Sequence, residues 1–203
     1  MIEDVLALAL ALPRTEQRHL IALAGPPASG KSTLADAVAE RLTQSGRRAA
    51  VLPMDGFHLG NHVLDQRGLR ARKGAPETFD LDGLRAMLRR LADTPRLDIA
   101  IPRFDRGADL AEAGADIIDI ETEIVIVEGN YLLLDRPGWR DLIDLWSASV
   151  LLSSEISILR ERLTSRWADL PDEEAARKVE ENDLPNARLV LSSSRPADIC
   201  LSI

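Results

Sequence analysis

A phosphate-binding loop is the clearest chemical signal in this sequence. Its residues are Gly25, Pro26, Pro27, Ala28, Ser29, Gly30, Lys31, Ser32 and Thr33. In this G-x-x-x-x-G-K-[ST] pattern the glycines let the backbone curl, so that its N–H groups point at phosphate oxygens. Lys31 can reach the β- and γ-phosphates, and the Ser32 hydroxyl can ligate magnesium. The alternative is an accidental glycine-rich turn. The pattern predicts a site for ATP and Mg²⁺.

Two acidic residues each follow an apolar, strand-like segment. Asp55 follows residues 49–54, and Glu128 follows residues 124–127. Ligands gather at the carboxyl ends of parallel strands, so we expect Asp55 near the γ-phosphate, on the strand beside the phosphate-loop strand. There Asp55 can accept the proton of an attacking hydroxyl, while Glu128 can hold magnesium through a water or orient Asp55. The alternatives are a loop or capping aspartate and a helix-capping glutamate.

Two arginines, Arg162 and Arg166, lie one helical turn apart on a predicted helix. Their i, i+4 spacing places them on one face. Arginines that close over a triphosphate neutralise charge in the transition state, so we predict catalytic roles for both and a lid over about residues 162–186. The alternative is a solvated basic face that pairs with Glu155, Glu161 and Asp169.

Apolar runs that alternate with helical periodicity define the elements that must position these groups. We expect strands over residues 19–24, 49–54, 123–127, 145–152 and 197–203, and helices over residues 2–12, 31–44, 81–91, 155–167 and 172–191. Buried strands that alternate with helices predict an α/β fold with three layers, typical of P-loop NTPases. We expect a five-stranded parallel sheet covered by helices on both faces, plus a helical lid. One domain would span residues 1–203, with the phosphate loop at 25–33 and an acceptor region at 55–106.

Composition excludes some partners. Aromatic residues make up 3% of the chain and its net charge is -8, so we expect no nucleic-acid partner. The segment 60–106 has ten Lys and Arg against seven Asp and Glu. This basic excess is either a chance feature of the surface or a sign that the segment faces an anionic ligand. No stretch predicts a membrane span or an export signal, so we expect a cytoplasmic protein. A homodimer is left open. Cys200 lies in an apolar run and is expected to be buried.

The segment after the second predicted strand resembles bacterial type I pantothenate kinase. It contains Asp55-Gly56-Phe57, Arg67-Gly68-Leu69 and Lys73-Gly74-Ala75-Pro76-Glu77-Thr78-Phe79-Asp80, a succession similar to the D-G-F, R-G-L and K-G-x-P-E-S-Y-D of that family. More broadly, the chain resembles the uridine kinase and phosphoribulokinase group. This resemblance implies that Asp55 is the general base, that Glu128 belongs to the magnesium site, and that the adenine rests near Arg195.

Further segments resemble the acceptor side of the same group. Residues 102–106 (Pro-Arg-Phe-Asp-Arg) resemble an acceptor-side P-x-F-D-R stretch, and residues 182–186 resemble compact bacterial members, some labelled as fructose-transport kinases. The candidate acceptor-binding residues are Asp55, His58, Arg103, Asp105, Arg106 and Asn130. His58 and His62 could equally be loop histidines without a role, and Tyr131 could line the pocket or belong to the core. Pantothenate kinase has Tyr-Ser-His where this chain has residues 103–105, which favours a sugar or nucleoside acceptor over pantothenate.

Two functions fit these signals. The first is a kinase that transfers the γ-phosphate of ATP to a hydroxyl of a small metabolite. The second is a nucleotide-driven switch or NTPase that acts on a partner protein. The [NT]-K-x-D signature of guanine-specific GTPases does not occur around any of the three lysines. The two functions differ in whether ADP release depends on a small-molecule acceptor.

Overall fold

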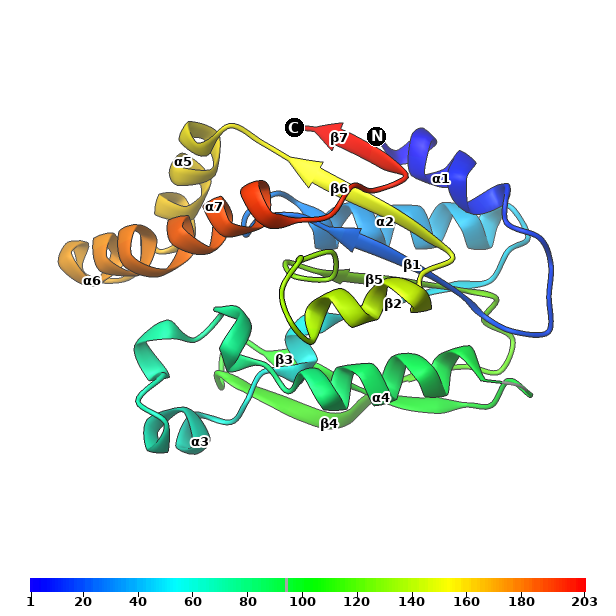
Figure 1. Ribbon diagram of the computed structural model, residues 1–203, viewed down its shortest axis with the longest axis horizontal. Coiled ribbons are helices and arrows are strands. Elements are labelled where there is room, and N and C mark those ends of the chain that lie inside the picture. Colours follow the sequence, from blue (N-terminus) through cyan, green and yellow to red (C-terminus); the bar gives the residue numbers. More distant parts are fainter. Residues whose placement is uncertain (94) are drawn as a thin grey trace.

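The computed structural model describes residues 1–93 and 95–203, which form a parallel sheet between two layers (Figure 1). The sheet strands are β1 (His19–Ala24), β2 (Ala49–Pro53), β5 (Ile124–Gly129), β6 (Ala148–Ser153) and β7 (Ile199–Ser202). They are all parallel, in the order β2-β5-β1-β6-β7. The α/β fold with a five-stranded parallel sheet is therefore confirmed. The sequence indicates it because β1 and β5 are apolar throughout most of their length, as strands covered on both faces must be.

One face of the sheet is covered by two helices, α1 (Ile2–Leu10) and α2 (Lys31–Gln44). Leu34, Val38 and Leu42 recur at helical spacing along α2 and are buried against the strands. The short α1 packs on α2 and on β6. This layer supports α2 from behind, so its N-terminus, where the phosphate loop ends, is held firmly at the edge of the sheet.

The opposite face is covered by α4 (Leu81–Ala92), the 3-10 helix η4 (Trp139–Leu145) and α7 (Leu184–Ser193). Asp80 caps α4 by accepting a hydrogen bond from the Gly83 amide over 2.9 Å. The core between this layer and the sheet contains Tyr131, whose ring meets the edge of Trp139 at a centroid distance of 5.4 Å. Tyr131 thus belongs to the core, one of the two alternatives that the sequence left open.

A β-hairpin that the sequence does not predict lies below this layer. It consists of β3 (Ile99–Asp105) and β4 (Leu110–Ile118), paired antiparallel outside the main sheet. The residues of β4 are mostly exposed and polar, so no apolar run announces the strand. The hairpin packs on η1 (Met54–Phe57), the 3-10 helix that carries Asp55. A Cβ at Gly56 would stand 2.6 Å from the Pro102 carbonyl oxygen, so this close approach requires glycine.

Residues 156–193 form a mostly helical segment that contains residues 162–186, the range predicted as a lid. It comprises α5 (Ile156–Arg166), α6 (Asp172–Arg177), the π-helix η5 (Lys178–Asp183) and α7. Leu163, Val179 and Leu184 pack together as its small separate core. A π-helix shifts the side chains that follow it around the helix axis, and such segments are frequent at functional sites.

The connecting segments complete the chain, with α3 (Asn61–Gln66), η2 (Arg70–Arg72) and η3 (Pro76–Thr78) in the acceptor region. Some expectations need correction. The fourth strand begins at Ala148 and not at residue 145, because the preceding residues form η4. Cys200 is exposed, since alternate residues of the edge strand β7 face outward. Within the described part of the chain, no helix is long and apolar enough to cross a bilayer.

Candidate active site

The phosphate loop joins the end of β1 to the start of α2. Its backbone has positive φ at Ala28 (63°) and Gly30 (80°), which curls the chain around the Lys31 side chain. Lys31 is buried, and its Nζ donates a hydrogen bond to the Pro26 carbonyl oxygen over 2.9 Å. Burial lowers the pKa of Lys31 to about 8, although the nearby negative charges of Glu128 and Asp55 act in the opposite direction. The loop therefore holds a cationic group inside a ring of amide donors.

Ser32 and Glu128 are directly joined at the end of β5. The Ser32 hydroxyl donates a hydrogen bond to Oε1 of Glu128 over 3.0 Å, and Glu128 is almost fully buried. Burial raises the pKa of Glu128, and the charge of Lys31 counters this rise. Two oxygens of the kind that Mg²⁺ prefers thus stand side by side next to the phosphate loop.

Asp55 is close to these groups, but its strand is not the neighbour of β1. The sheet order places β5 between β2 and β1, so Glu128 and not Asp55 ends the strand beside the phosphate-loop strand. The pairing of Pro53 with Glu128 brings the end of β2 level with the end of β5. Asp55 follows two residues later in η1 and faces the same cavity as Ser32 and Glu128.

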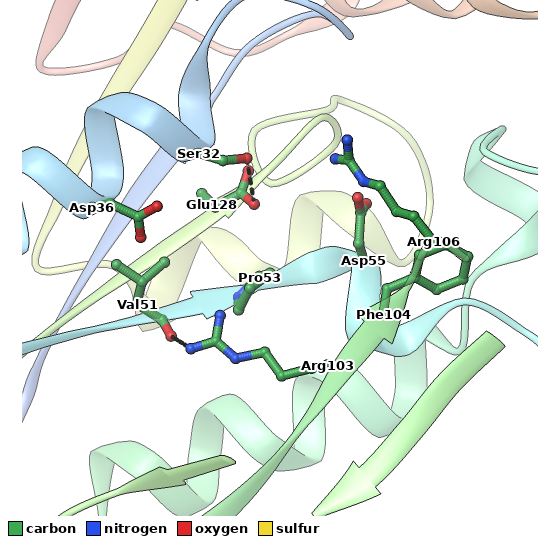
Figure 2. Close-up of a pocket in the computed structure, with 9 residues that line it drawn as sticks. All are labelled: Ser32, Asp36, Val51, Pro53, Asp55, Arg103, Phe104, Arg106 and Glu128. Carbon is green, nitrogen blue, oxygen red and sulfur yellow. Dashed lines mark hydrogen bonds between the residues drawn. The ribbon is translucent and has the colours of Figure 1, made fainter. Parts of the chain in front are cut away.

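This cavity has a volume of about 180 Å³ and an open mouth (Figure 2). Its lining residues are Ser32, Asp36, Val51, Pro53, Asp55, Arg103, Phe104, Arg106 and Glu128. Five of them were among the residues predicted from the sequence: Ser32, Asp55, Arg103, Arg106 and Glu128. Asp36 was missed, although its position four residues after Ser32 on α2 places it on the same helix face.

The hairpin contributes two arginines to the cavity, Arg103 and Arg106, which differ in whether they have an acidic partner. Nη2 of Arg103 forms an ion pair with Asp116 over 2.6 Å and also donates to the Val51 carbonyl oxygen over 3.4 Å. Arg106 reaches the cavity from the turn that follows β3. Asp105 instead shapes that turn, because its Oδ1 accepts hydrogen bonds from the amides of Gly107 and Ala108.

His58 stands beside the cavity with a defined orientation. Its Nδ1 lies 2.8 Å from the Asp55 carbonyl oxygen, and its ring packs 4.1 Å from that of Phe79 and 4.6 Å from that of Phe104, between centroids. Burial lowers the pKa of His58, which favours the neutral ring. A carbonyl oxygen can only accept, so Nδ1 carries the proton and Nε2 keeps a lone pair for another partner.

The lid arginines both approach the phosphate loop. Nη1 of Arg162 donates a hydrogen bond to the Ala28 carbonyl oxygen over 3.3 Å. Arg166 is exposed, and partial desolvation together with the charge of Arg106 lowers its pKa. Among the described residues Arg166 has no acidic partner within 4.0 Å. The more distant charges of Asp183 and Asp55 act to raise its pKa. Arg162 therefore contacts the phosphate loop directly, whereas Arg166 is near the site only through the charges around it.

Two candidates lie apart from the cavity. Arg195 is exposed, and its backbone amide donates to the Leu133 carbonyl oxygen over 2.8 Å, which fixes the loop before β7. Asn130 follows β5 and does not line the cavity; its neighbour Tyr131 donates a hydrogen bond to the Gly74 carbonyl oxygen over 2.6 Å. These contacts position the surrounding loops.

The residues present fit a magnesium nucleotide. An ammonium has three hydrogens, and Pro26 accepts only one from Lys31, which leaves donors that aim into the loop. Within residues 1–93 and 95–203 no cluster of three or more acids, histidines or cysteines could hold a metal alone. Mg²⁺ is commonly held by few protein ligands together with waters and substrate phosphates, and the adjacent oxygens of Ser32 and Glu128 suit that role.

A phosphate loop on a parallel sheet, an acid at the end of the next strand and an arginine-bearing lid together define a P-loop phosphotransferase. The model of the phosphoribulokinase / uridine kinase family matches residues 20–163, and the chain belongs to this family. It is thus a kinase, a phosphotransferase that acts on hydroxyl acceptors.

Individual relatives agree with this assignment. A crystal structure from Silicibacter sp. TM1040, described as a "putative fructose transport system kinase", has 43% sequence identity and a TM-score of 0.92, covering 98% of each chain. The "putative uridine kinase C227.14" of Schizosaccharomyces pombe is 32% identical over 203 residues, covering 95% of this chain and 86% of that protein. A pantothenate kinase of Cutibacterium acnes is 43% identical over 76 residues, which is 36% of this chain and 22% of that protein.

Proposed function

We propose that this protein is an ATP-dependent kinase that transfers the γ-phosphate to a hydroxyl of a small polyhydroxy metabolite, a sugar or nucleoside before a pantothenate-like acid. The observation that carries the proposal is the shared cavity of Asp55, Ser32 and Glu128. A base for the acceptor hydroxyl and ligands for a metal nucleotide open onto the same space, as transfer between two bound substrates requires.

The triphosphate would be bound by the amides of the phosphate loop, residues 25–33, and by the ammonium of Lys31. Arg195 would lie beside the adenine. Ser32 and Glu128 would hold Mg²⁺, which when bound supplies positive charge next to the phosphate oxygens. The negative charge of Glu128 favours the protonated form of Lys31, which is the form that would bind the triphosphate.

Asp55 would act as the general base. A sugar or nucleoside hydroxyl is a weak nucleophile near neutral pH, and it must lose its proton as the phosphorus–oxygen bond forms. Asp55 would take that proton from within the cavity. Arg162 and Arg166 would close with the lid and neutralise charge that develops on the transferred group, excluding water from it.

The acceptor would occupy the space between η1 and the hairpin. Its contacts would come from Asp55, His58, Arg103, Asp105, Arg106 and Asn130. Within this set, His58 is suited to accept a hydrogen bond from an acceptor hydroxyl, because its Nδ1 is engaged by the Asp55 carbonyl and Nε2 is left as an acceptor. Arg103 and Asp105 would mainly hold the hairpin in place, since each is engaged within it.

The test compares wild-type protein with Asp55→Asn. Asparagine has the same shape but cannot accept the proton, so kcat should fall by about 10²–10⁴-fold. ATP affinity should stay close to that of the wild type, because the phosphate loop holds the triphosphate. ADP release across a panel of sugars, nucleosides and pantothenate measures the first effect, and calorimetry with ATP the second.

A matched control is Asp65→Asn, since Asp65 is an exposed acid that pairs with Arg70 away from the cavity. It should behave like the wild type. Full acceptor-dependent turnover in Asp55→Asn would place the base elsewhere. ADP release that no acceptor stimulates in the wild type would favour the alternative, a nucleotide-driven switch or NTPase.

A further inference from the structure

We infer that the hydroxyl acceptor carries an anionic oxygen group, a carboxylate or a phosphate, and that Arg106 binds this group. The inference rests on the proposed kinase function and, among its possible acceptors, favours sugar phosphates, nucleotides and acids over neutral sugars and nucleosides. It is argued from the two arginines that line the cavity, of which Arg103 has an acidic partner and Arg106, among the described residues, has none.

Most basic side chains of the acceptor region are already engaged. Nζ of Lys73 contacts Oδ1 of Asp109 and Oδ1 of Asn61, both over 2.7 Å. The other engaged groups are the arginines of three ion pairs: Arg70–Asp65 at 2.8 Å, Arg72–Glu77 at 3.7 Å and Arg103–Asp116 at 2.6 Å. These cations serve the local structure, and none of them needs an anionic ligand to complete its contacts.

Arg106 differs from all of them. Among the described residues it has no acidic group within 4.0 Å and no hydrogen-bond partner, yet its side chain lines the cavity with Asp55. In Figure 2 the guanidinium of Arg103 points toward Val51, whereas that of Arg106 extends on the side of Asp55. The positive charge of Arg106 also helps to lower the pKa of Lys31. Arg106 is thus a cation at the site without a protein partner.

The turn that carries Arg106 is held in place. Asp105 accepts hydrogen bonds from the two amides that follow Arg106, at 2.7 and 3.0 Å. At the other end of the turn, Asp109 is fixed by Lys73 and by Nδ2 of Asn61. The backbone that carries Arg106 is therefore fixed beside the cavity, while its exposed guanidinium stays free to contact a ligand.

The acidic residues of the cavity explain why an anionic acceptor would need Arg106. Asp36, Asp55 and Glu128 line the same space, and their field would repel an anionic acceptor from the base. A neutral acceptor needs no compensation. Arg106 belongs to the hairpin on the acceptor side, while the cations suited to the triphosphate, Lys31 among them, belong to the phosphate loop and the lid. Its charge therefore suits the second substrate.

The test uses pairs of acceptors that differ only in the anionic group. Pantothenate and panthenol, and glycerate and glycerol, probe a carboxylate; ribose 5-phosphate and ribose probe a phosphate. For each pair, kcat/KM is measured by ADP release with wild type, Arg106→Gln, Arg106→Lys and the control Arg70→Gln. Arg70 has the same charge but pairs with Asp65 outside the cavity.

We expect the anionic member of at least one pair to be preferred, and Arg106→Gln to reduce that preference about tenfold or more, as loss of a charged hydrogen bond does. Arg106→Lys should restore part of it, and Arg70→Gln should match the wild type. Preference for the neutral members, an unchanged preference in Arg106→Gln, or a raised KM for ATP alone would each overturn the inference.

If no acceptor supports turnover, the proposed kinase function fails, but the anion site can still be judged. Calorimetry with pantothenate, glycerate and ribose 5-phosphate, in the presence of ADP and Mg²⁺, then decides. Binding by wild type that Arg106→Gln weakens at least tenfold supports an anion site at Arg106. Absence of binding to the wild type, or equal binding to both proteins, overturns it.

Discussion

Nδ2 of Asn182 in the lid donates a hydrogen bond to the backbone carbonyl oxygen of Lys73 in the acceptor region over 2.7 Å. Nη1 of Arg72 donates to the Glu181 carbonyl oxygen over 3.2 Å beside it. The buried Asn186 supports this link, because its Nδ2 donates to Oδ1 of Asn182 over 3.3 Å. The π-helix thus joins the lid to the loop that holds the hairpin turn, and movement of one should carry the other.

Asn182→Ala should loosen this link. We expect KM for the acceptor to rise about 2- to 10-fold, the usual effect of losing one neutral hydrogen bond, while the KM for ATP changes less. Steady-state kinetics with both substrates measures this difference. Gln44→Ala removes an exposed amide from α2 and serves as the control. Equal changes in both KM values would contradict a specific link to the acceptor region.

Lys31→Met should abolish transfer without unfolding the protein. The variant removes the ammonium that faces the triphosphate but keeps the length and the apolar stem of the side chain. Because burial already disfavours the charged form of Lys31, the free energy of unfolding should be unchanged or raised. Turnover and thermal melting measure the two effects, with the exposed Arg41→Met on the same helix as control. Turnover at the wild-type rate would refute the phosphate-loop assignment.

ATP affinity should weaken as pH rises above about 8. The pKa of Lys31 in the free protein is about 8, so above this pH the free protein holds the neutral amine and must take up a proton to bind the triphosphate in its charged form. While the pKa in the complex stays higher, the affinity should fall up to about tenfold per pH unit. Calorimetry in buffers of different ionisation enthalpy measures the proton uptake.

The same shift also bears on stability. The folded pKa of Lys31 lies below its ordinary value of 10.5, so the unfolded chain binds more protons between about pH 8 and 10.5. The contribution of Lys31 to the free energy of unfolding should therefore increase with pH across this window. Lys31→Met should lack both pH effects, and a wild-type ATP affinity that is flat from pH 7 to 9.5 would contradict the first.

Arg162→Ala and Arg166→Ala should lower kcat more than they raise the KM for the acceptor. Arg166 lies near enough to Asp55 and Lys31 to interact with their charges, so its loss should reduce kcat by about 10³-fold or more, the lower end of the effect known for arginines that stabilise phosphoryl transfer. Loss of Arg162, which contacts Ala28, should have a smaller effect. Arg160→Ala is the control, because Arg160 pairs with Glu180 on another face of α5. An unchanged kcat in both variants would mean that the arginines are merely solvated.

Local patterns in the sequence predicted much of the fold and part of the site. The phosphate loop is contiguous, and its chemistry depends on residue types at fixed spacing, so no distant contact is needed to recognise it. The apolar runs of β1 and β5 predict buried strands because a strand covered on both faces must be apolar on both. Glu128 could be placed at the site for a similar reason, since the carboxyl ends of parallel strands share one edge.

The tertiary structure decided how segments that are distant in sequence lie relative to one another. The sheet order places β5 beside β1, although β2 precedes it in the chain, because strand neighbours depend on crossovers that no local pattern encodes. The polar strand β4 could not be predicted from the sequence, since it pairs through its backbone and exposes most of its side chains. Its Asp116 neutralises Arg103, whereas Arg106 remains unpaired at the cavity. The sequence by itself determined that basic residues lie in the acceptor region; only the folded hairpin decides which charge is available to a ligand, because that depends on partners brought together from separate strands.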